Sequence, residues 1–237
     1  RIHFKNLQLA THWGKLHLAG TADVARRTLK QQVRLQLTQL AGLQPLLSQA
    51  ISGTADIEAA VQGPWDLPSA DLKCSTREIR FGEFQAADTV VNLQIEPQQD
   101  APASVHSIGI QGDLQSRELS HAGLDLSLPQ AGLVLDAAWT LDNRLQLHRL
   151  KLQTPNETLQ ISGLVSGKGP FQTRVQANCA ALDSLPLELA LPFAAGLSLN
   201  STISGNWRSQ SLTSRLQARF RDLKALPPDI LNLTGNS

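Results

Sequence analysis

The chain has 237 residues, of which 41% are hydrophobic, and this is enough apolar material for a substantial core. Its 21 basic and 20 acidic side chains nearly cancel and are scattered, so the basic surface typical of a nucleic-acid-binding protein is absent and no nucleic-acid partner is expected. No apolar run reaches the length of about 18 residues that a membrane-spanning helix needs.

Apolar and polar residues alternate from the first residues onward, beginning with Ile2 and Phe4. A period of two predicts antiparallel strands that have one apolar face and one polar face. The alternating stretches in chain order are 2–4, 7–9, 16–18, 33–37, 57–61, 72–76, 79–81, 91–95, 108–110, 124–128 and 133–135. Turns are predicted between them at 13–14, 63–64, 81–82, 97, 102, 112–113, 129, 142–143, 155–156 and 167–170.

One segment departs from this alternation. Its apolar residues recur with the spacing of a helix, which predicts one or two helical turns: Leu43, Leu46, Leu47, Ala50 and Ile51. Residues 98–104 are the best candidate for a loop. Residues 182–195 are predicted to be irregular, because they contain Pro186 and Pro192.

The sequence also nearly repeats itself. Residues 1–9 align with 144–152 at an offset of 143 residues, and from Val33, which aligns with Val175, the offset is 142. Apolar character is kept between the copies while residue identity is not, which is typical of stacked repeat architectures.

We therefore predict one elongated β segment over 1–237, with repeat copies 1–98 and 144–237 joined by 99–143. The alternation is already under way at Ile2, so we expect this segment to belong to a longer protein. Periodicity alone does not decide whether the apolar face is sealed inside a sandwich or barrel or left open, because both arrangements alternate in the same way.

Residues that could perform catalysis or bind metal form no recognisable pattern. His3 and His17 align with Gln146 and Gln160 in the other copy, and none of the six histidines has metal-ligand spacing. No nucleophile, phosphate-binding or dinucleotide-binding motif occurs, and the carboxylates are scattered. We expect no enzymatic activity, no metal and no cofactor.

Two pairs of unusual residues are explained most simply by packing. Trp65 and Trp207 follow Gly63 and Gly205 at matching places in the two copies, and we expect them to anchor turns. Cys74 and Cys179 do not match each other and lie at apolar positions of their strands, so we expect buried thiols and no disulfide.

One stretch carries a resemblance to a known family. Residues 43–65 followed by 67–72 read as an apolar plug, a glycine, an alternating strand, a second glycine, a short gap, a proline and another strand. This unit resembles the TamB family and its wider AsmA-like relatives in Gram-negative bacteria. Residues 190–216 resemble the same unit but lack a proline after Trp207.

The resemblance implies an all-β fold, an elongated antiparallel repeat sheet curled into an open half-pipe, often called a β-taco, with short helical plugs. It implies a periplasmic segment of a protein anchored in the inner membrane and active in outer-membrane biogenesis. The implied partners are phospholipid or unfolded outer-membrane protein, together with an outer-membrane barrel of the TamA type.

On this interpretation an apolar groove carries phospholipid acyl chains or shelters unfolded outer-membrane β-strands. We expect it to be lined by Leu16, Leu18, Val33, Leu35, Leu37, Ile57, Val61, Leu93, Leu145, Leu147, Leu159, Ile161, Val175, Leu199 and Ile203. Two other functions remain open from the sequence. One is a closed β-sandwich or β-solenoid that serves as a binding or adhesion module, and the other is a carbohydrate-active enzyme on a β scaffold.

Overall fold

Strands make up almost all of the computed structural model, which describes residues 2–46, 49–100, 105–124, 126–140, 144–167, 169–180 and 194–224. The strands are β1 (Ile2–Thr11), β2 (Gly14–Asp23), β3 (Thr28–Leu37), β4 (Ile51–Pro64), β5 (Ser69–Phe81), β6 (Phe84–Asp100), β7 (Val105–His121), β8 (Leu126–Thr140), β9 (Arg144–Gln153), β10 (Glu157–Ser166), β11 (Pro170–Cys179), β12 (Ala194–Asn206) and β13 (Ser211–Lys224). Two short 3-10 helices, η1 (Leu40–Leu46) and η2 (Ala122–Leu124), complete the described elements. The predicted all-β class is confirmed.

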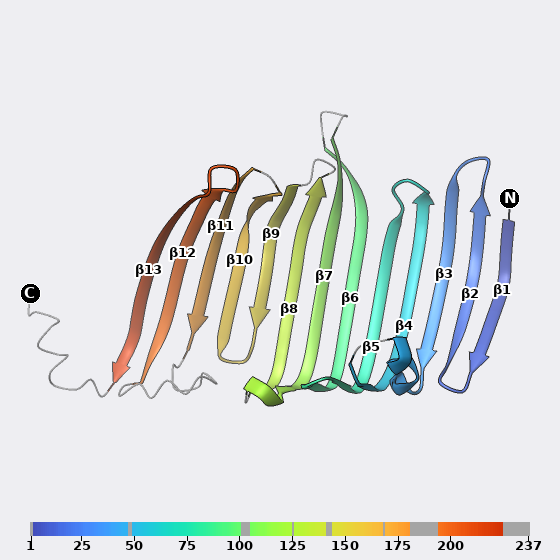
Figure 1. The fold of residues 1–237 in the computed structure, drawn as a ribbon, viewed down its shortest axis with the longest axis horizontal. Coiled ribbons are helices and arrows are strands. Elements are labelled where there is room, and N and C mark those ends of the chain that lie inside the picture. Colours follow the sequence, from blue (N-terminus) through green and yellow to red (C-terminus); the bar gives the residue numbers. More distant parts are fainter. Residues whose placement is uncertain are drawn as a thin grey trace, which may run out of the picture.

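The strands follow one another across a single antiparallel sheet in chain order (Figure 1). Each strand from β2 to β12 is hydrogen-bonded to the strand before it and to the strand after it, so the sheet is a meander without crossovers. Thirteen strands spaced about 4.8 Å apart make a ribbon roughly 60 Å long. β1 and β13 form its two edges.

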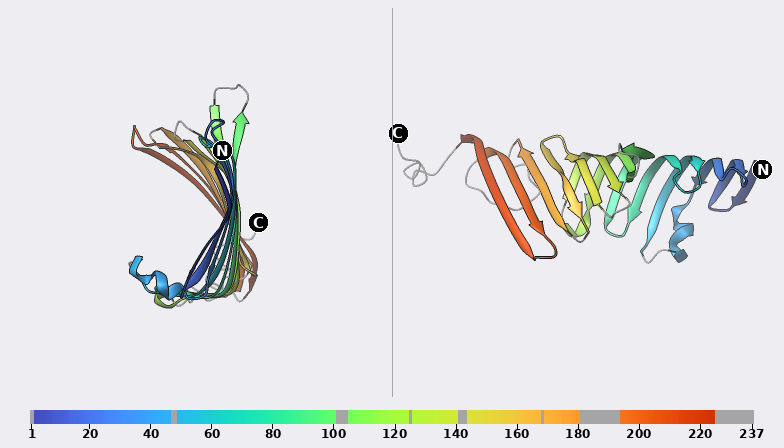
Figure 2. Two further views of the ribbon diagram at one scale, coloured as in Figure 1. Left: turned by 90° about the vertical axis from the view of Figure 1, so that its right-hand side faces the viewer. Right: turned by 90° about the horizontal axis from the view of Figure 1, so that it is seen from above.

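The sheet curls along the direction of its strands, so that it is a half-pipe open on one side (Figure 2). The helix η1 lies on the hollow side, near one end of the strands. Among the described residues no second sheet covers either face. The predicted open half-pipe is therefore confirmed, and the closed sandwich that periodicity had left open is not formed by these residues.

Bulges help the strands to curl while keeping apolar residues on one face. In β5, residues on the concave face are two apart up to Thr76, but the next one, Ile79, is three residues further on. Glu78 lies between them with a φ of 49°, where the pairing of β5 with β4 shifts in register. In β7, Glu118 has the same left-handed backbone with a φ of 51°, although the pairing of β7 with β6 and β8 shows no shift of register there. An extra residue such as the one in β5 bends a strand and re-aims the side chains that follow it.

Several predicted turns lie inside strands instead. Pro97 lies within β6, beyond Ile95, the last residue of β6 that pairs with β5, so its missing N–H is tolerated on that side. Pro129 lies within β8 opposite Glu118, between the pairs Arg117–Gln130 and Leu119–Leu128. The predicted turn at 112–113 is wrong because Gly112 and Asp113 simply continue the ladder of β7.

The predicted helical segment is displaced. η1 covers Leu40–Leu46 and contains Pro45, while Ile51 begins β4. Leu47 lies outside the described residues, as do 101–104 of the predicted loop, whose first residues 98–100 belong to β6. The predicted irregular segment also lies mostly outside them, since 181–193 are not described and Ala194 begins β12.

The two repeat copies follow the same backbone path. The bounds of β1, β2 and β3 recur in β9, β10 and β11 at offsets of 143 or 142 residues, to within one residue. Backbone hydrogen bonds between turns recur too. The Thr38 N–H donates to the Trp13 carbonyl at 3.0 Å, and its counterpart Ala180 donates to Asn156 at 2.9 Å.

Candidate functional site

The concave face carries an apolar row that crosses every strand. Directly paired residues of an antiparallel sheet share a face, so the register defines which side chains form a row. From β1 to β13 this row is Leu9, Leu16, Leu35, Ile57, Cys74, Val91, Leu114, Leu133, Leu152, Leu159, Ala177, Leu199 and Ala218. No polar residue interrupts it.

A second row runs beside the first and is nearly as apolar. It consists of Leu7, Leu18, Val33, Ala59, Leu72, Leu93, Gly112, Leu135, Leu150, Ile161, Val175, Ser201 and Leu216. The rows are two residues apart along each strand, which is about 7 Å. We call these two rows together the apolar track.

The helix η1 identifies the face on which the apolar track lies. Leu40 of η1 is 4% exposed and forms a small core with Leu37 and Ala55, against which Leu35 and Trp13 pack. Leu35 belongs to the first row, and η1 lies on the hollow side of the sheet (Figure 2). The apolar track is therefore the floor of the half-pipe.

All fifteen predicted groove residues lie on this face. Ten belong to the track, and Leu37, Val61, Leu145, Leu147 and Ile203 flank it in the same register. Leu37 is 4% exposed beneath η1, so it supports the floor at that end and presents little surface to a ligand. Whether the others contact lipid stays a prediction.

Sequence reasoning left out much of the middle of the track. Track residues of β5 to β9 that it did not name include Leu72, Val91, Leu114, Leu133 and Leu150. The same alternation marks each of them in the sequence.

Hydroxyl groups form a polar shoulder beside the track. Thr76, Thr89 and Ser116 are paired neighbours on β5, β6 and β7, in the row that continues from Ala55. The Thr89 and Ser116 hydroxyl oxygens are 2.9 Å apart, and Ser116 is 3% exposed. The Thr76 hydroxyl oxygen is buried without a hydrogen-bond partner among the described residues. The floor is therefore uniformly apolar only along the first row of the track.

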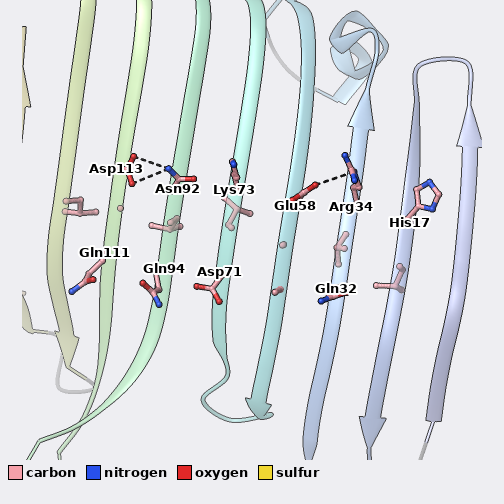
Figure 3. A pocket seen from close by; sticks show the side chains of 18 of the residues that line it. His17, Gln32, Arg34, Glu58, Asp71, Lys73, Asn92, Gln94, Gln111 and Asp113 are labelled. Carbon is pink, nitrogen blue, oxygen red and sulfur yellow. Dashed lines mark hydrogen bonds and ion pairs between the residues drawn. The ribbon is translucent and has the colours of Figure 1, made fainter.

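The opposite, convex face is polar and holds a shallow hollow of about 950 Å³ (Figure 3). Basic, acidic and amide side chains lie side by side on its strands, among them Arg34, Glu58 and Lys73 on β3, β4 and β5. Arg34 pairs with Glu58 at 3.4 Å, and the Asn92 side-chain amide donates to the Asp113 carboxylate at 3.1 Å. Both members of the Arg34–Glu58 pair are 54% exposed, so water screens them. We interpret this face as a solvated charge ladder.

Groups suited to catalysis or metal binding are sparse in the described part of the chain. It contains no cluster of three or more His, Cys, Asp or Glu side chains that could hold a metal ion. His121 lies 3.6 Å from the Glu83 carboxylate and packs edge-on against Phe84. Burial in the first row raises the pKa of the Cys74 thiol, which favours its neutral form. Neither described helix has the length and apolar character needed to cross a membrane.

Comparisons with protein-family models, with curated proteins and with solved structures give no match. The resemblance to TamB and AsmA-like proteins therefore stays a prediction from the sequence. The fold agrees with it, but fold alone does not assign function.

Proposed function

We propose that the apolar track carries phospholipid acyl chains, and that this chain is a periplasmic segment of an outer-membrane biogenesis protein of the TamB or AsmA-like kind. One observation supports the proposal above all others. A row of apolar side chains crosses all thirteen strands without a polar interruption, on a concave face that no other described residue covers beyond η1.

The energetics suit such a cargo. Each methylene group removed from water gains about 0.8 kcal/mol, so a short length of acyl chain along the track already offsets a modest loss of freedom. An acyl chain forms no directional contact, which fits a floor where Leu, Val, Ala and Cys take equivalent places. Exposed apolar surface of this extent is a hazard for a soluble protein unless something fills it.

The direct test is an organic extract of the chain purified without detergent. We expect mass spectrometry to find phospholipid bound to the wild-type protein. The variants Leu35→Asp and Ile161→Asp place a charge in the first and second rows, and each should lose most of that lipid.

Matched controls lie one residue away on the other face. Gln36→Asp and Gln160→Asp add the same charge to the convex face, where Gln36 pairs with Lys15 and Gln160 with Lys151. These controls should retain wild-type lipid, and circular dichroism should show β-structure in all four variants. A wild-type extract without phospholipid would refute the proposal.

The edges of the sheet favour a second cargo, an unfolded outer-membrane β-strand. β1 and β13 each pair on one side only within the described residues, and an unpaired edge can add a strand by β-augmentation. An outer-membrane barrel partner of the TamA type would then receive the strand. Binding of a labelled outer-membrane protein peptide that lipid does not displace would support this cargo.

A further inference from the structure

One rim of the half-pipe displays exposed tryptophans. We use the term upper rim for the turns 24–27, 65–68 and 207–210 together with the last residues of β8, which lie along the top of Figure 1. Trp65 is 41% exposed, Trp139 is 40% exposed and Trp207 is 56% exposed. Tryptophan is usually well buried, so three exposed indoles along one rim call for an explanation.

Two of these indoles are placed on the hollow side of the sheet. Trp139 pairs with Ile108 and Leu145, which puts it on the concave face. The Trp207 ring stacks on Phe171 with the ring centres 4.6 Å apart, and Phe171 pairs with Val165 in the same concave row. Both therefore lie where a lipid would enter the trough.

The third indole is held by the same backbone contact as Trp207. The backbone N–H of Trp65 donates to the Arg27 carbonyl at 2.9 Å, and the backbone N–H of Trp207 donates to the Gly169 carbonyl at 3.2 Å. β4, β8 and β12 carry the three tryptophans at or next to their ends, so one indole recurs every four strands, or roughly every 19 Å. A row of separate anchors suits a broad surface better than a compact pocket.

The charges of the upper rim suit anionic groups. Its three turns hold Arg26, Arg27 and Arg208, all exposed, against the single carboxylate of Asp66. Asp66 pairs with Arg27 at 3.1 Å, which leaves a net positive charge on these turns. Guanidinium groups bind phosphate through paired hydrogen bonds, and indoles favour the boundary between lipid headgroups and acyl chains.

The opposite rim differs. Trp13 lies there, but it packs against the small core formed with η1. Exposed tryptophan is thus a property of the upper rim alone among the described residues.

We propose that the upper rim binds the headgroup layer of a phospholipid bilayer, with Trp65, Trp139 and Trp207 inserted at the interface and the arginines on lipid phosphates. This surface is distinct from the apolar track, and bilayer binding does not require the track to carry lipid. It places the open side of the trough beside the source or the destination of a lipid.

Co-sedimentation with vesicles of phosphatidylethanolamine and phosphatidylglycerol tests the proposal. We expect the wild-type chain to bind and brominated lipids to quench its tryptophan fluorescence. The triple variant Trp65→Ala, Trp139→Ala, Trp207→Ala should lose roughly tenfold or more in partitioning, because three apolar side chains no longer enter the interface. Changing Arg26 and Arg208 to Gln should remove most of the salt dependence of binding.

Two controls separate this surface from the apolar track. Phe84→Ala removes an aromatic side chain, 50% exposed, at the opposite end of the strands and should bind vesicles as the wild type does. Leu35→Asp should lose extracted lipid yet still bind vesicles. Absence of wild-type binding, or equal binding by the triple variant, would overturn the proposal. If the triple variant loses β-structure, Trp207→Ala alone, at the most exposed site, decides the outcome by the same criterion.

Discussion

The strands β1–β5 and β9–β13 trace the same path with different side chains. Leu35 and Leu37 of β3 correspond to Ala177 and Cys179 of β11, yet the pairing on both sides of these strands is equivalent. What the two regions share is backbone: strand bounds, turn hydrogen bonds and the glycines that allow close approach. The comparison teaches that this architecture repeats a shape and leaves side-chain volume free to vary.

The regions differ most clearly at one hairpin. The last pair between β4 and β5 is Gln62 with Ser69, whereas β12 and β13 remain paired up to Asn206 and Ser211, two residues further along the first strand. Pro64 and Pro68 explain the difference, because a proline cannot donate to the ladder. The second hairpin has no proline there, so its turn closes tightly over 207–210.

The two regions should differ most in how much stability is lost when a side chain of the small core beneath η1, or its counterpart in the second region, is shortened. Leu37→Ala should lower the free energy of unfolding by about 2–4 kcal/mol, since Leu37 is 4% exposed and its removal leaves a cavity. Cys179→Ala at the equivalent place should cost about 1 kcal/mol or less, because a smaller side chain is lost. Urea denaturation of both variants compares the losses, and equal losses would contradict this account of the core.

Two glycines should behave alike in both regions. A methyl group added at Gly20 would collide with the Lys30 carbonyl oxygen, and one at Gly163 with the carbonyl oxygen of Gln172. Gly20→Ala and Gly163→Ala should each cost about 1–3 kcal/mol, as the neighbouring strand must shift. Gly132→Ala is the control, because an added methyl group there meets no heavy atom closer than 3.8 Å. Thermal unfolding of the three variants measures these losses, and clearly different losses for Gly20→Ala and Gly163→Ala would contradict the prediction.

A smaller effect concerns Cys74, whose counterpart in β13 is Ala218, because Ile57 pairs with Cys74 and its counterpart Leu199 pairs with Ala218. Burial raises the pKa of the Cys74 thiol in the folded chain, so the unfolded chain ionises first as the pH rises. The stability from this group is complete below the ordinary thiol pKa of about 8.5 and falls as the pH rises through the higher folded value. The chain has no tyrosine to mask the effect. Cys74→Ala should flatten the alkaline part of the stability profile, and an unchanged profile would count against it.

The smallest expected difference in stability comes from the ion pair between Arg27 and Asp66, which has no counterpart in the second region. Arg27 and Asp66 are 66% and 70% exposed, and the counterpart of Arg27 is Gly169. Arg27→Gln should change the free energy of unfolding by about 0.5 kcal/mol or less, and the change should vanish at high salt. A larger, salt-independent loss would show that Arg27 contributes through packing.

The fold was predictable from local patterns to an unusual degree. Alternation identifies which side chain faces which way, and in a meander the strand order is the chain order. The errors arose where local signals are ambiguous. Pro97 and Pro129 look like strand ends, yet each lies where the ladder does not need its N–H. Whether a face is covered depends on distant segments, which periodicity cannot report.

The groove residues were predictable by face but not by accessibility. The alternation that marks Leu35 as concave marks Leu37 in the same way, and only packing beneath η1 distinguishes them. The exposed rim was not predicted either. Trp65 and Trp207 were expected to anchor turns, and their backbone N–H groups do bond the preceding turn, but nothing in the sequence indicates that the indoles stay exposed.

The meander topology has a consequence for how the chain is made. Each strand pairs only with the strands before and after it in the sequence, so loop-closure entropy is small at every step. Assembly can proceed like a zipper as successive hairpins leave a ribosome or a translocation pore. A nascent chain of this design completes each stretch of its sheet without waiting for its final residue.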